Sequence, residues 1–350
     1  VRQFVMPMMG GFDGLDITHI DPFSNNNVLS GKSPSDHYAY YSLDKTLDII
    51  KDSDGDFALF YDVVSMPGIT NTTLTDRLIS IISDPENGRK DALAIIDLDD
   101  GYLESYENNG VRAGGAANSI INTANTRELN TSYAATYYPR VRMRDTLRAS
   151  GDVFVCPASV AGIGALAYSD AVSDPWFAPA GFNRGGISIL GGSNGPRVVG
   201  THKNMTKADR DNLYAKNINP IARFPAVGEI VIFGQKTLQS SPANTALNRI
   251  NVRRLMVYLK SRIEKVADTV LFDANLESTW SRFRTGADKV LSDVQSRFGI
   301  QEYTLILDET TTTATYQDQN IMYAKVLVKP ARAIEYIVVD FVITRSGVEF

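Results

Sequence analysis

The stretch NRINVRRLMVYLKSRIEKVADTVLF, residues 248–272, carries the clearest structural pattern in the chain. Apolar residues recur in it every three or four positions and therefore fall on one helical face. The pattern predicts a long amphipathic helix that buries this face against a core. The inward positions are Ile250, Leu255, Leu259, Ile263, Val266 and Val270.

A second helix is predicted in TWSRFRTGADKVLSDVQSRFG, residues 279–299, with Gly299 suited to the position just past its end. The rest of the chain favours strands, in YTLILD, IMYAKVLVK and IEYIVVDFVIT. Two helices on one face of a mixed or antiparallel sheet make a two-layer α+β domain. We assign this domain to residues 211–350, beginning with a strand in VGEIVIFGQKTL. The inward side chains of the second helix are Trp280, Phe283, Ala287, Val290, Leu291 and Val294.

Residues 28–210 show a different pattern, in which strands and helices alternate. FALFYDVV and DALAIIDLDD favour short buried strands, and TDRLISIISDPENG between them favours a helix. This spacing indicates a βαβ unit with two parallel strands. DVFVCP is predicted to be a third strand that leads into another helix. The expected fold is therefore an α/β domain followed by the α+β domain.

Two other stretches contain too much glycine and proline for regular structure. Residues 1–27 are predicted to be a loop-rich remnant of a larger upstream region, because the chain opens with Val1 and lacks the features of a signal peptide. The stretch DPWFAPAGFNRGGISILGGSNGPR is predicted to be an ordered loop. Its aromatic residues Trp176, Phe177 and Phe182 would anchor it.

The composition narrows the class of protein. Apolar residues make up 43% and charged residues 21%, which is typical of a globular protein. A single cysteine, Cys156, excludes an internal disulfide and a cysteine cluster for zinc. The sequence has no stretch of about 18 consecutive apolar residues, so we expect no direct membrane insertion. The net charge of −5 disfavours non-specific nucleic-acid binding, and the negative charge lies in residues 1–210, with 18 basic and 25 acidic residues.

Residues suited to catalysis are scarce. His19, His37 and His202 lie in polar, turn-like contexts, and Cys156 lies in an apolar strand that favours an inert buried thiol. The glycines of GIGALA and GGSNG lack the third glycine of a dinucleotide fingerprint and the ending of a phosphate loop. We therefore predict no cofactor and no metal, and attribute the glycines of GIGALA to close packing of a strand-to-helix turn.

Acidic residues cluster twice. Asp52, Asp54 and Asp56 lack the residue order and the distal glutamate of a calcium loop. The stretch Asp97–Asp100 follows a predicted parallel strand, at the edge where open α/β sheets bind ligands. We favour solvated turn acids for both clusters and keep an acidic enzyme site at 97–100 as an alternative.

The last strand, in IEYIVVDFVITRSGVEF, has two interpretations of equal weight. An unpaired terminal strand is a template for pairing with another chain through backbone hydrogen bonds. An ordinary internal strand with neighbours in its own sheet has the same composition. The pattern leaves both interpretations open.

Five stretches together resemble the C-terminal half of tail sheath proteins from contractile-tailed bacteriophages. They occur in the expected order and spacing over residues 157–350. The stretches are WFAPAGFNRG, INPIARFP, FGQKTL, LNRINVRRLMVYLKSRIEK and VKPARAIEYIVVDFVIT.

The resemblance implies a structural subunit and not an enzyme. It implies an inner C-terminal domain that lines a helical sheath around the tail tube, an outward-facing middle domain, and terminal arms that add strands to neighbouring copies. Contraction of such a sheath drives the tube through the host envelope. The implied partners are other copies, the tube protein, and baseplate and tail terminator proteins, in a virion tail assembled in the host cytoplasm. Under this resemblance, we expect the family's N-terminal arm to be missing from this sequence.

Given this resemblance, basic residues on the two long helices become candidates for contacts with an acidic tube surface or adjacent subunits. A solvated helix face is the alternative. Two further functions stay open: a sheath of a bacteriocin particle or type VI secretion machine, and an α/β enzyme with its site at 97–100. The candidate contact residues are Arg249, Arg253, Arg254, Arg262, Arg282, Arg284, Tyr336, Val338 and Phe341.

Overall fold

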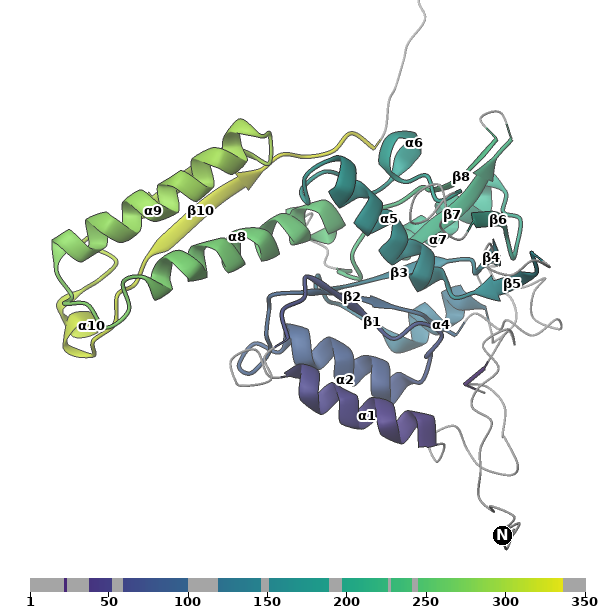
Figure 1. Ribbon diagram of the computed structural model, residues 1–350, viewed down its shortest axis with the longest axis horizontal. Helices are drawn as coiled ribbons and strands as arrows, with labels where there is room; N and C mark the ends of the chain where they lie inside the picture. The colour runs from purple at the N-terminus through teal and green to yellow at the C-terminus, as the bar shows by residue number, and fades with distance from the viewer. Residues whose placement is uncertain are drawn as a thin grey trace, which may run out of the picture.

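The computed structural model describes residues 22–23, 38–51, 59–99, 119–145, 151–188, 197–225, 228–240 and 245–335. Figure 1 shows a broad α/β part and an elongated part that projects from its side. We call the described residues up to 240 the body and residues 249–335 the lobe. Within these described ranges, no helix is both long and apolar enough to cross a membrane.

The centre of the body is a five-stranded sheet with the order β1-β2-β3-β7-β8. β1, β2, β3 and β7 run parallel, and β8 pairs antiparallel with β7 at one edge. The predicted βαβ unit is confirmed as β1, α2 and β2, although β1 is shorter than FALFYDVV suggested. The strands are β1 (Val63–Ser65), β2 (Leu93–Ile96), β3 (Ala134–Tyr138), β7 (Ile218–Phe224) and β8 (Glu229–Ile232).

Helices cover both faces of this sheet, which explains why all four residues of β2 are apolar and buried. Leu93 and Ile95 lie in the core on the side of α5, and Ala94 and Ile96 lie in the core on the side of α1 and α2. Figure 1 shows α1 and α2 on one side of the strands and α5 on the other. The helices are α1 (Tyr38–Lys51), α2 (Thr72–Ser83), α4 (Ile120–Arg127), α5 (Ala158–Val172), α6 (Gly181–Arg184) and α7 (Lys207–Ala215).

DVFVCP forms a strand, as predicted, but in a different sheet from β1 and β2. It is β5 (Val153–Cys156), which pairs antiparallel with β4 (Val141–Arg144), and β4 pairs antiparallel with β6 (Arg197–Thr201). The pairing of β4 with β5 is local, because only a short connection separates them. β5 therefore joins its sheet through a local antiparallel pairing.

The strand in VGEIVIFGQKTL lies in the five-stranded sheet of the body, although we expected it in the C-terminal domain. It forms β8, which pairs with β7, and β7 in turn pairs with β3. Both strands lie after position 211, where we expected the second domain to begin. The domain limits themselves stay a prediction, and the sheet places these two strands with the α/β part.

The lobe consists of two long helices against a β-hairpin. Both helices were predicted, and most of their expected inward residues are buried, among them Leu255, Leu259, Phe283 and Leu291. These side chains meet residues of the hairpin in two neighbouring cores. The elements are η2 (Ala246–Asn248), a 3-10 turn before the lobe, then α8 (Ile250–Asp268), α9 (Glu277–Ser296), β9 (Ile300–Ile306), α10 (Ala314–Asp318) and β10 (Lys325–Pro330).

The end of α9 differs from the prediction for Gly299. The left-handed residue is Phe298, with a φ of 63°, and it is 77% exposed. The Phe298 amide donates to the Gln295 carbonyl oxygen, and the Gly299 amide donates to the Val294 carbonyl oxygen, as in a Schellman motif. Gly299 is needed for space, since a Cβ there would lie 2.6 Å from Val294 and 3.0 Å from the Trp176 ring.

β9 and β10 form an antiparallel hairpin with one apolar face. Val326 and Val328 pack against the lobe core, whereas Leu327 between them is 48% exposed. Within the described residues, no third strand pairs with this hairpin. The predicted final strand in IEYIVVDFVIT lies almost entirely outside the described residues.

Candidate functional site at the junction of body and lobe

The first turns of α8 lie against the body and are buried on all sides. Every residue from Ile250 to Leu255 is buried, whereas Arg262 and Glu264 further along are exposed. The apolar stripe of α8 faces the lobe core, so its opposite side needs another cover. The body supplies that cover, and Ile250 is itself part of the body core on the side of α5.

Two of the predicted contact arginines attach this part of α8 to the body. The Arg253 guanidinium lies 3.9 Å from the Tyr133 ring centroid and donates to the Ser132 hydroxyl oxygen. Burial lowers the pKa of Arg253. Arg254 pairs with Asp170 on α5 at 2.5 Å. Because Arg253 and Arg254 are only 7% and 5% exposed, they offer almost no charged surface to another protein.

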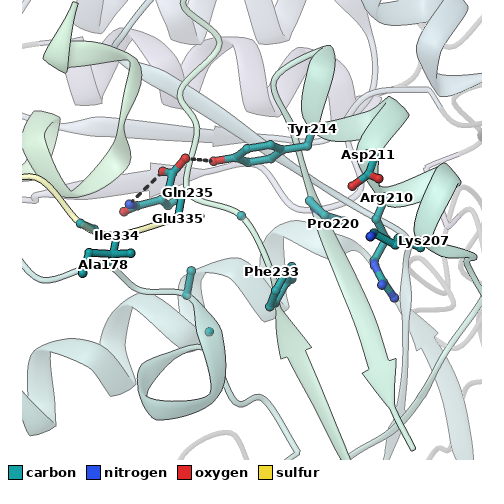
Figure 2. Close-up of a pocket in the computed structure, with 14 residues that line it drawn as sticks. Ala178, Lys207, Arg210, Asp211, Tyr214, Pro220, Phe233, Gln235, Ile334 and Glu335 are labelled. Carbon is teal, nitrogen blue, oxygen red and sulfur yellow. Dashed lines mark hydrogen bonds between the residues drawn. The ribbon is translucent and has the colours of Figure 1, made fainter. Parts of the chain in front are cut away.

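Arg249, directly before α8, binds the last described residue of the chain. Its Nε donates to Oε1 of Glu335 at 2.5 Å, and one of its terminal nitrogens donates to Oε2 at 2.8 Å. The Tyr214 hydroxyl donates to Oε2 at 2.9 Å, and the Gln235 amide donates to Oε1 at 3.3 Å. Figure 2 shows Tyr214 and Gln235 turned toward Glu335. The Glu335 carboxylate, at the end of the lobe, therefore binds α7 through Tyr214, the segment after β8 through Gln235, and the start of the lobe through Arg249.

Lys236 adds a second positive charge beside this group. Its Nζ donates to the Tyr214 carbonyl oxygen at 2.6 Å and lies 4.1 Å from the Tyr214 ring centroid. Burial lowers the pKa of Lys236, and the neighbouring Arg249 lowers it further, whereas Glu335 opposes the shift. The Glu335 carboxylate thus compensates two cations at the base of the lobe.

Trp176 forms the second connection between body and lobe. It belongs to the loop after α5 and is 4% exposed, because its ring lies in the lobe core with Leu255 and Val294. Its indole Nε1 donates to the Arg297 carbonyl oxygen at 3.0 Å, and its ring meets the Tyr258 ring edge-on at 5.4 Å. The sequence predicted that Trp176 anchors its loop, and the structure shows that the anchor point is the lobe.

A cavity of about 230 Å³ lies next to Glu335. One wall comes from residues 333–335 of the lobe, and the other walls come from the body. Figure 2 shows Phe233 and Pro220 on the body side, with Lys207 and Arg210 of α7 further away. Both the lobe and the body therefore contribute walls to this cavity.

The other predicted contact residues lie further out on the lobe. Arg262 is exposed, with its guanidinium 5.2 Å from the Tyr258 ring centroid. Arg282 pairs with Asp273 at the surface, and Arg284 donates to the Leu307 carbonyl oxygen. Tyr336, Val338 and Phe341 lie outside the described residues. The structure therefore brings Arg249, Arg253 and Arg254 together at the junction and leaves Arg262 and Arg282 exposed.

The interpretation of Asp97 as a solvated turn acid was wrong. Asp97 is 6% exposed and accepts hydrogen bonds from the Ser159 amide at 3.1 Å, the Ser159 hydroxyl at 2.6 Å and the Gly68 amide at 2.9 Å. Its carboxylate lies at the amino end of α5, where Pro157 supplies no side-chain cap. Asp97 therefore connects the end of β2 to α5. Asp100 and the cluster at 52–56 lie outside the described residues.

The remaining candidates for chemistry fit structural roles. Burial raises the pKa of the Cys156 thiol to about 11, as expected for an inert thiol. GIGALA lies inside α5 and not in the turn before it, and a Cβ on Gly162 would come within 2.5 Å of the Tyr137 ring. Close packing thus accounts for Gly162. In the described part of the chain, no three histidine, cysteine or acidic residues are grouped to hold a metal ion. His19, His37 and GGSNG lie outside the described residues.

Sequence reasoning missed Glu335. The available signal was its charge, since it stands between apolar residues in AIEYIVV. An acidic side chain in an otherwise apolar segment requires either solvent or a positive partner. The partner, Arg249, is 86 positions away in the chain, so its identity was not evident from local pattern.

Comparison with known proteins finds relatives in sequence and similar folds among solved structures. A family model of the phage tail sheath C-terminal domain matches residues 243–344. The tail sheath protein of Vibrio phage KVP40 is 38% identical over 187 residues, which cover 53% of this chain and 26% of the relative. That of Enterobacteria phage T4 is 37% identical over 193 residues, or 55% of this chain and 27% of the relative. The aligned region thus spans about a quarter of the length of these curated relatives.

Solved structures share the fold at low sequence identity. The sheath of an extracellular contractile injection system, PVC, in the contracted state has a TM-score of 0.60 and 18% identity, covering 98% of both chains. The contracted helical sheath of the anti-feeding prophage has a TM-score of 0.59 and 20% identity, covering 86% of this chain and 73% of the other. Residues 243–344 thus match the phage tail sheath C-terminal domain, and the chain is similar in sequence to the tail sheath proteins of phages.

Proposed function

We propose that this chain is a structural subunit of the contractile tail sheath of a bacteriophage and not an enzyme. It polymerises helically around the tail tube and contracts to drive the tube through the host envelope for genome ejection. The observation that carries this proposal is the lobe, where the family match coincides with a two-stranded hairpin that lacks a third strand among the described residues.

The hairpin supports assembly by strand addition. Its backbone edges can take a strand from another copy, because such pairing uses main-chain groups and needs no particular side chain. The lobe core already holds the inner face of the hairpin, through Val326 and Val328, so an added strand would extend a preformed layer. Other copies of the chain are therefore the proposed main partners.

The junction supports the transmission of force. Work done by rearranging subunits reaches the body only if the lobe does not bend at its base. The buried first turns of α8, Trp176 and the Glu335 carboxylate fix that base at separate points. In this arrangement the body faces outward and the lobe contacts the tail tube. Baseplate and tail terminator proteins are the proposed partners at the two ends of the virion tail. The tail is assembled in the host cytoplasm.

The exposed charges and apolar tip of the lobe are the proposed contact residues. Arg262 and Arg282 are exposed, and Phe272 in the turn between α8 and α9 is 99% exposed with a φ of 65°. An exposed phenylalanine in left-handed backbone conformation is unfavourable in an isolated subunit. Burial in an assembled sheath would remove the exposure.

A second candidate is the sheath of another contractile machine, such as a bacteriocin particle, a type VI secretion system or an extracellular injection system. The match to the PVC sheath over 98% of both chains favours it. The identity of 37–38% to phage proteins favours the phage sheath. An enzyme with a site at 97–100 has no support from Asp97, whose carboxylate is occupied at the end of α5.

Negative-stain electron microscopy of the full protein at high concentration tests the proposal. We expect tubular polysheaths. A variant that ends at Glu335 keeps the junction intact and removes residues 336–350, and we expect it to fold, by circular dichroism, but to form no tubes. Tubes from this variant would contradict strand exchange through the C-terminal segment, and only single globular particles from the full protein would contradict the sheath function.

A further inference from the structure

The lobe begins and ends at the same place. Arg249 precedes its first helix and Glu335 is its last described residue, yet the two side chains form a bidentate ion pair across 86 positions of sequence. Planar two-bond pairing between a guanidinium and a carboxylate fixes orientation as well as distance. The ion pair therefore closes the lobe at its base.

The same carboxylate is held by the body. The Tyr214 hydroxyl and the Gln235 amide each donate to one of its oxygens, and the Glu335 side chain is only 17% exposed. Figure 2 shows Glu335 between these two body residues. Both carboxylate oxygens thus have one partner from the lobe and one from the body.

The segment that leads to Glu335 has few other attachments. The Ala331 amide donates to the Gly299 carbonyl oxygen at 3.1 Å, within the lobe. Residues 332–334 are exposed, Ile334 by 82%, and within the described part of the chain we find no hydrogen bond from them to the body. Glu335 is accordingly the point at which the returning chain is attached to the body.

We propose that the Arg249–Glu335 pair is a clasp that sets the angle of the lobe against the body, and that opening it lets the lobe turn about its two remaining attachments, the buried first turns of α8 and the Trp176 contact. A lobe held at three separated points cannot turn, whereas a lobe held at two points can turn about the line that joins them. Trp176 packs in the lobe core with Leu255 and Val294 and is not among the residues that line the cavity beside Glu335, so the Trp176 and Glu335 attachments are distinct. The inference concerns one subunit and does not depend on polymerisation.

The test uses distances between spin labels in the whole chain. Cysteines replace Glu86, exposed on the body after α2, and Asp318, exposed on α10 of the lobe, in a background with Cys156→Ala. Pulsed electron paramagnetic resonance then measures the distance distribution in the parent, in Glu335→Gln and in a control. The control is Glu302→Gln, which breaks the Glu302–Lys329 contact of 3.9 Å, where both side chains are largely exposed.

We expect a narrow distribution in the parent and in Glu302→Gln, and a clearly broader or shifted one in Glu335→Gln. Exchange of the Ala331 amide, which donates to the Gly299 carbonyl oxygen, should become about tenfold faster in Glu335→Gln, since losing charge-assisted hydrogen bonds favours local opening. An unchanged distribution with unchanged exchange would overturn the proposal.

A second variant covers the case in which Glu335→Gln does not fold. Arg249→Lys keeps the positive charge but cannot form the two-bond fork, and we expect an intermediate broadening of the distance distribution. If neither variant folds, the pair is a requirement for folding and not a joint, which would also overturn the proposal. None of these outcomes depends on whether tubes form, so a failure of the clasp proposal can be distinguished from a failure of the proposed sheath function.

Discussion

Replacing Trp176 by alanine should uncouple the lobe from the body. The indole is 4% exposed, lies in the lobe core with Leu255 and Val294, and donates to the Arg297 carbonyl oxygen at 3.0 Å. Removing a buried tryptophan ring costs about 3–5 kcal/mol, because the lost burial adds to the cavity that remains. Since Trp176 belongs to the body and its contacts belong to the lobe, this loss falls on their association.

Trp280 offers a matched comparison within the lobe. It is the other tryptophan of the chain, is 6% exposed, and its indole Nε1 donates to Asn275 Oδ1 at 2.7 Å. Trp280→Ala removes a ring of the same size from a core that contains only lobe residues. We expect it to weaken the lobe itself by a similar amount without removing a contact to the body. Trp176→Phe should cost less than Trp176→Ala, since it keeps an aromatic ring and loses the hydrogen bond, worth about 1 kcal/mol.

Urea unfolding followed by circular dichroism and by fluorescence measures these effects. We expect one transition in the parent and two in Trp176→Ala, with the lobe unfolding first. For a slope of about 2 kcal/mol per molar urea, the loss moves the midpoint of the lobe down by about 1.5–2.5 M. Trp280→Phe leaves Trp176 as the single fluorescent reporter of the junction. A single transition in Trp176→Ala with a loss below about 1 kcal/mol would refute the role of Trp176 as a connection.

Three further predictions concern the body. Asp97→Asn should lower the free energy of unfolding by about 2–3 kcal/mol, because the amide nitrogen cannot accept hydrogen bonds from Ser159 and Gly68. An unchanged melting temperature would support the earlier interpretation of Asp97 as a solvated turn acid. Gly162→Ala should destabilise the body in thermal unfolding despite a helix-propensity gain of about 1 kcal/mol, since its methyl group meets the Tyr137 ring; a stabilised variant would contradict this packing. With its pKa raised to about 11, the Cys156 thiol at pH 8 should react with a disulfide reagent about a hundredfold more slowly than in the unfolded chain. Because the folded thiol holds its proton more tightly, its contribution to stability should be lost as the pH rises from about 9 to about 11, and equal reaction rates in both states would contradict the shift.

The sequence was informative where structure depends on local periodicity. The apolar stripes of α8 and α9 and the continuous apolar run of β2 reflect which faces are buried, and both patterns are visible within one element. Sheet membership is different, because β7 pairs with β3, which lies some 80 residues upstream, and β8 joins the sheet only through β7. The residue pattern of INPIARF and EIVI does not predict which sheet these two strands join.

The candidate contact residues illustrate the same limit for side chains. Arg253 and Arg254 stand next to the apolar stripe of α8, and sequence alone suggests a solvated or partner-facing flank. Their partners Ser132 and Asp170 lie 121 and 84 positions away. Burial of an arginine becomes favourable only when such a partner and an aromatic face are already in place, and periodicity does not report either.

The two halves of α8 therefore have different uses, and this narrows where assembly contacts are to be sought. In the first half Arg254 pairs with Asp170, and directly before the helix Arg249 pairs with Glu335, so reversing either positive charge would damage folding before it affected any partner. In the second half, Arg262 is exposed on a part of the helix that projects away from the body. A charge reversal there changes the surface without breaking an ion pair to the body. Arg262→Glu is accordingly the variant in which a loss of tubes with unchanged stability would assign a contact between molecules.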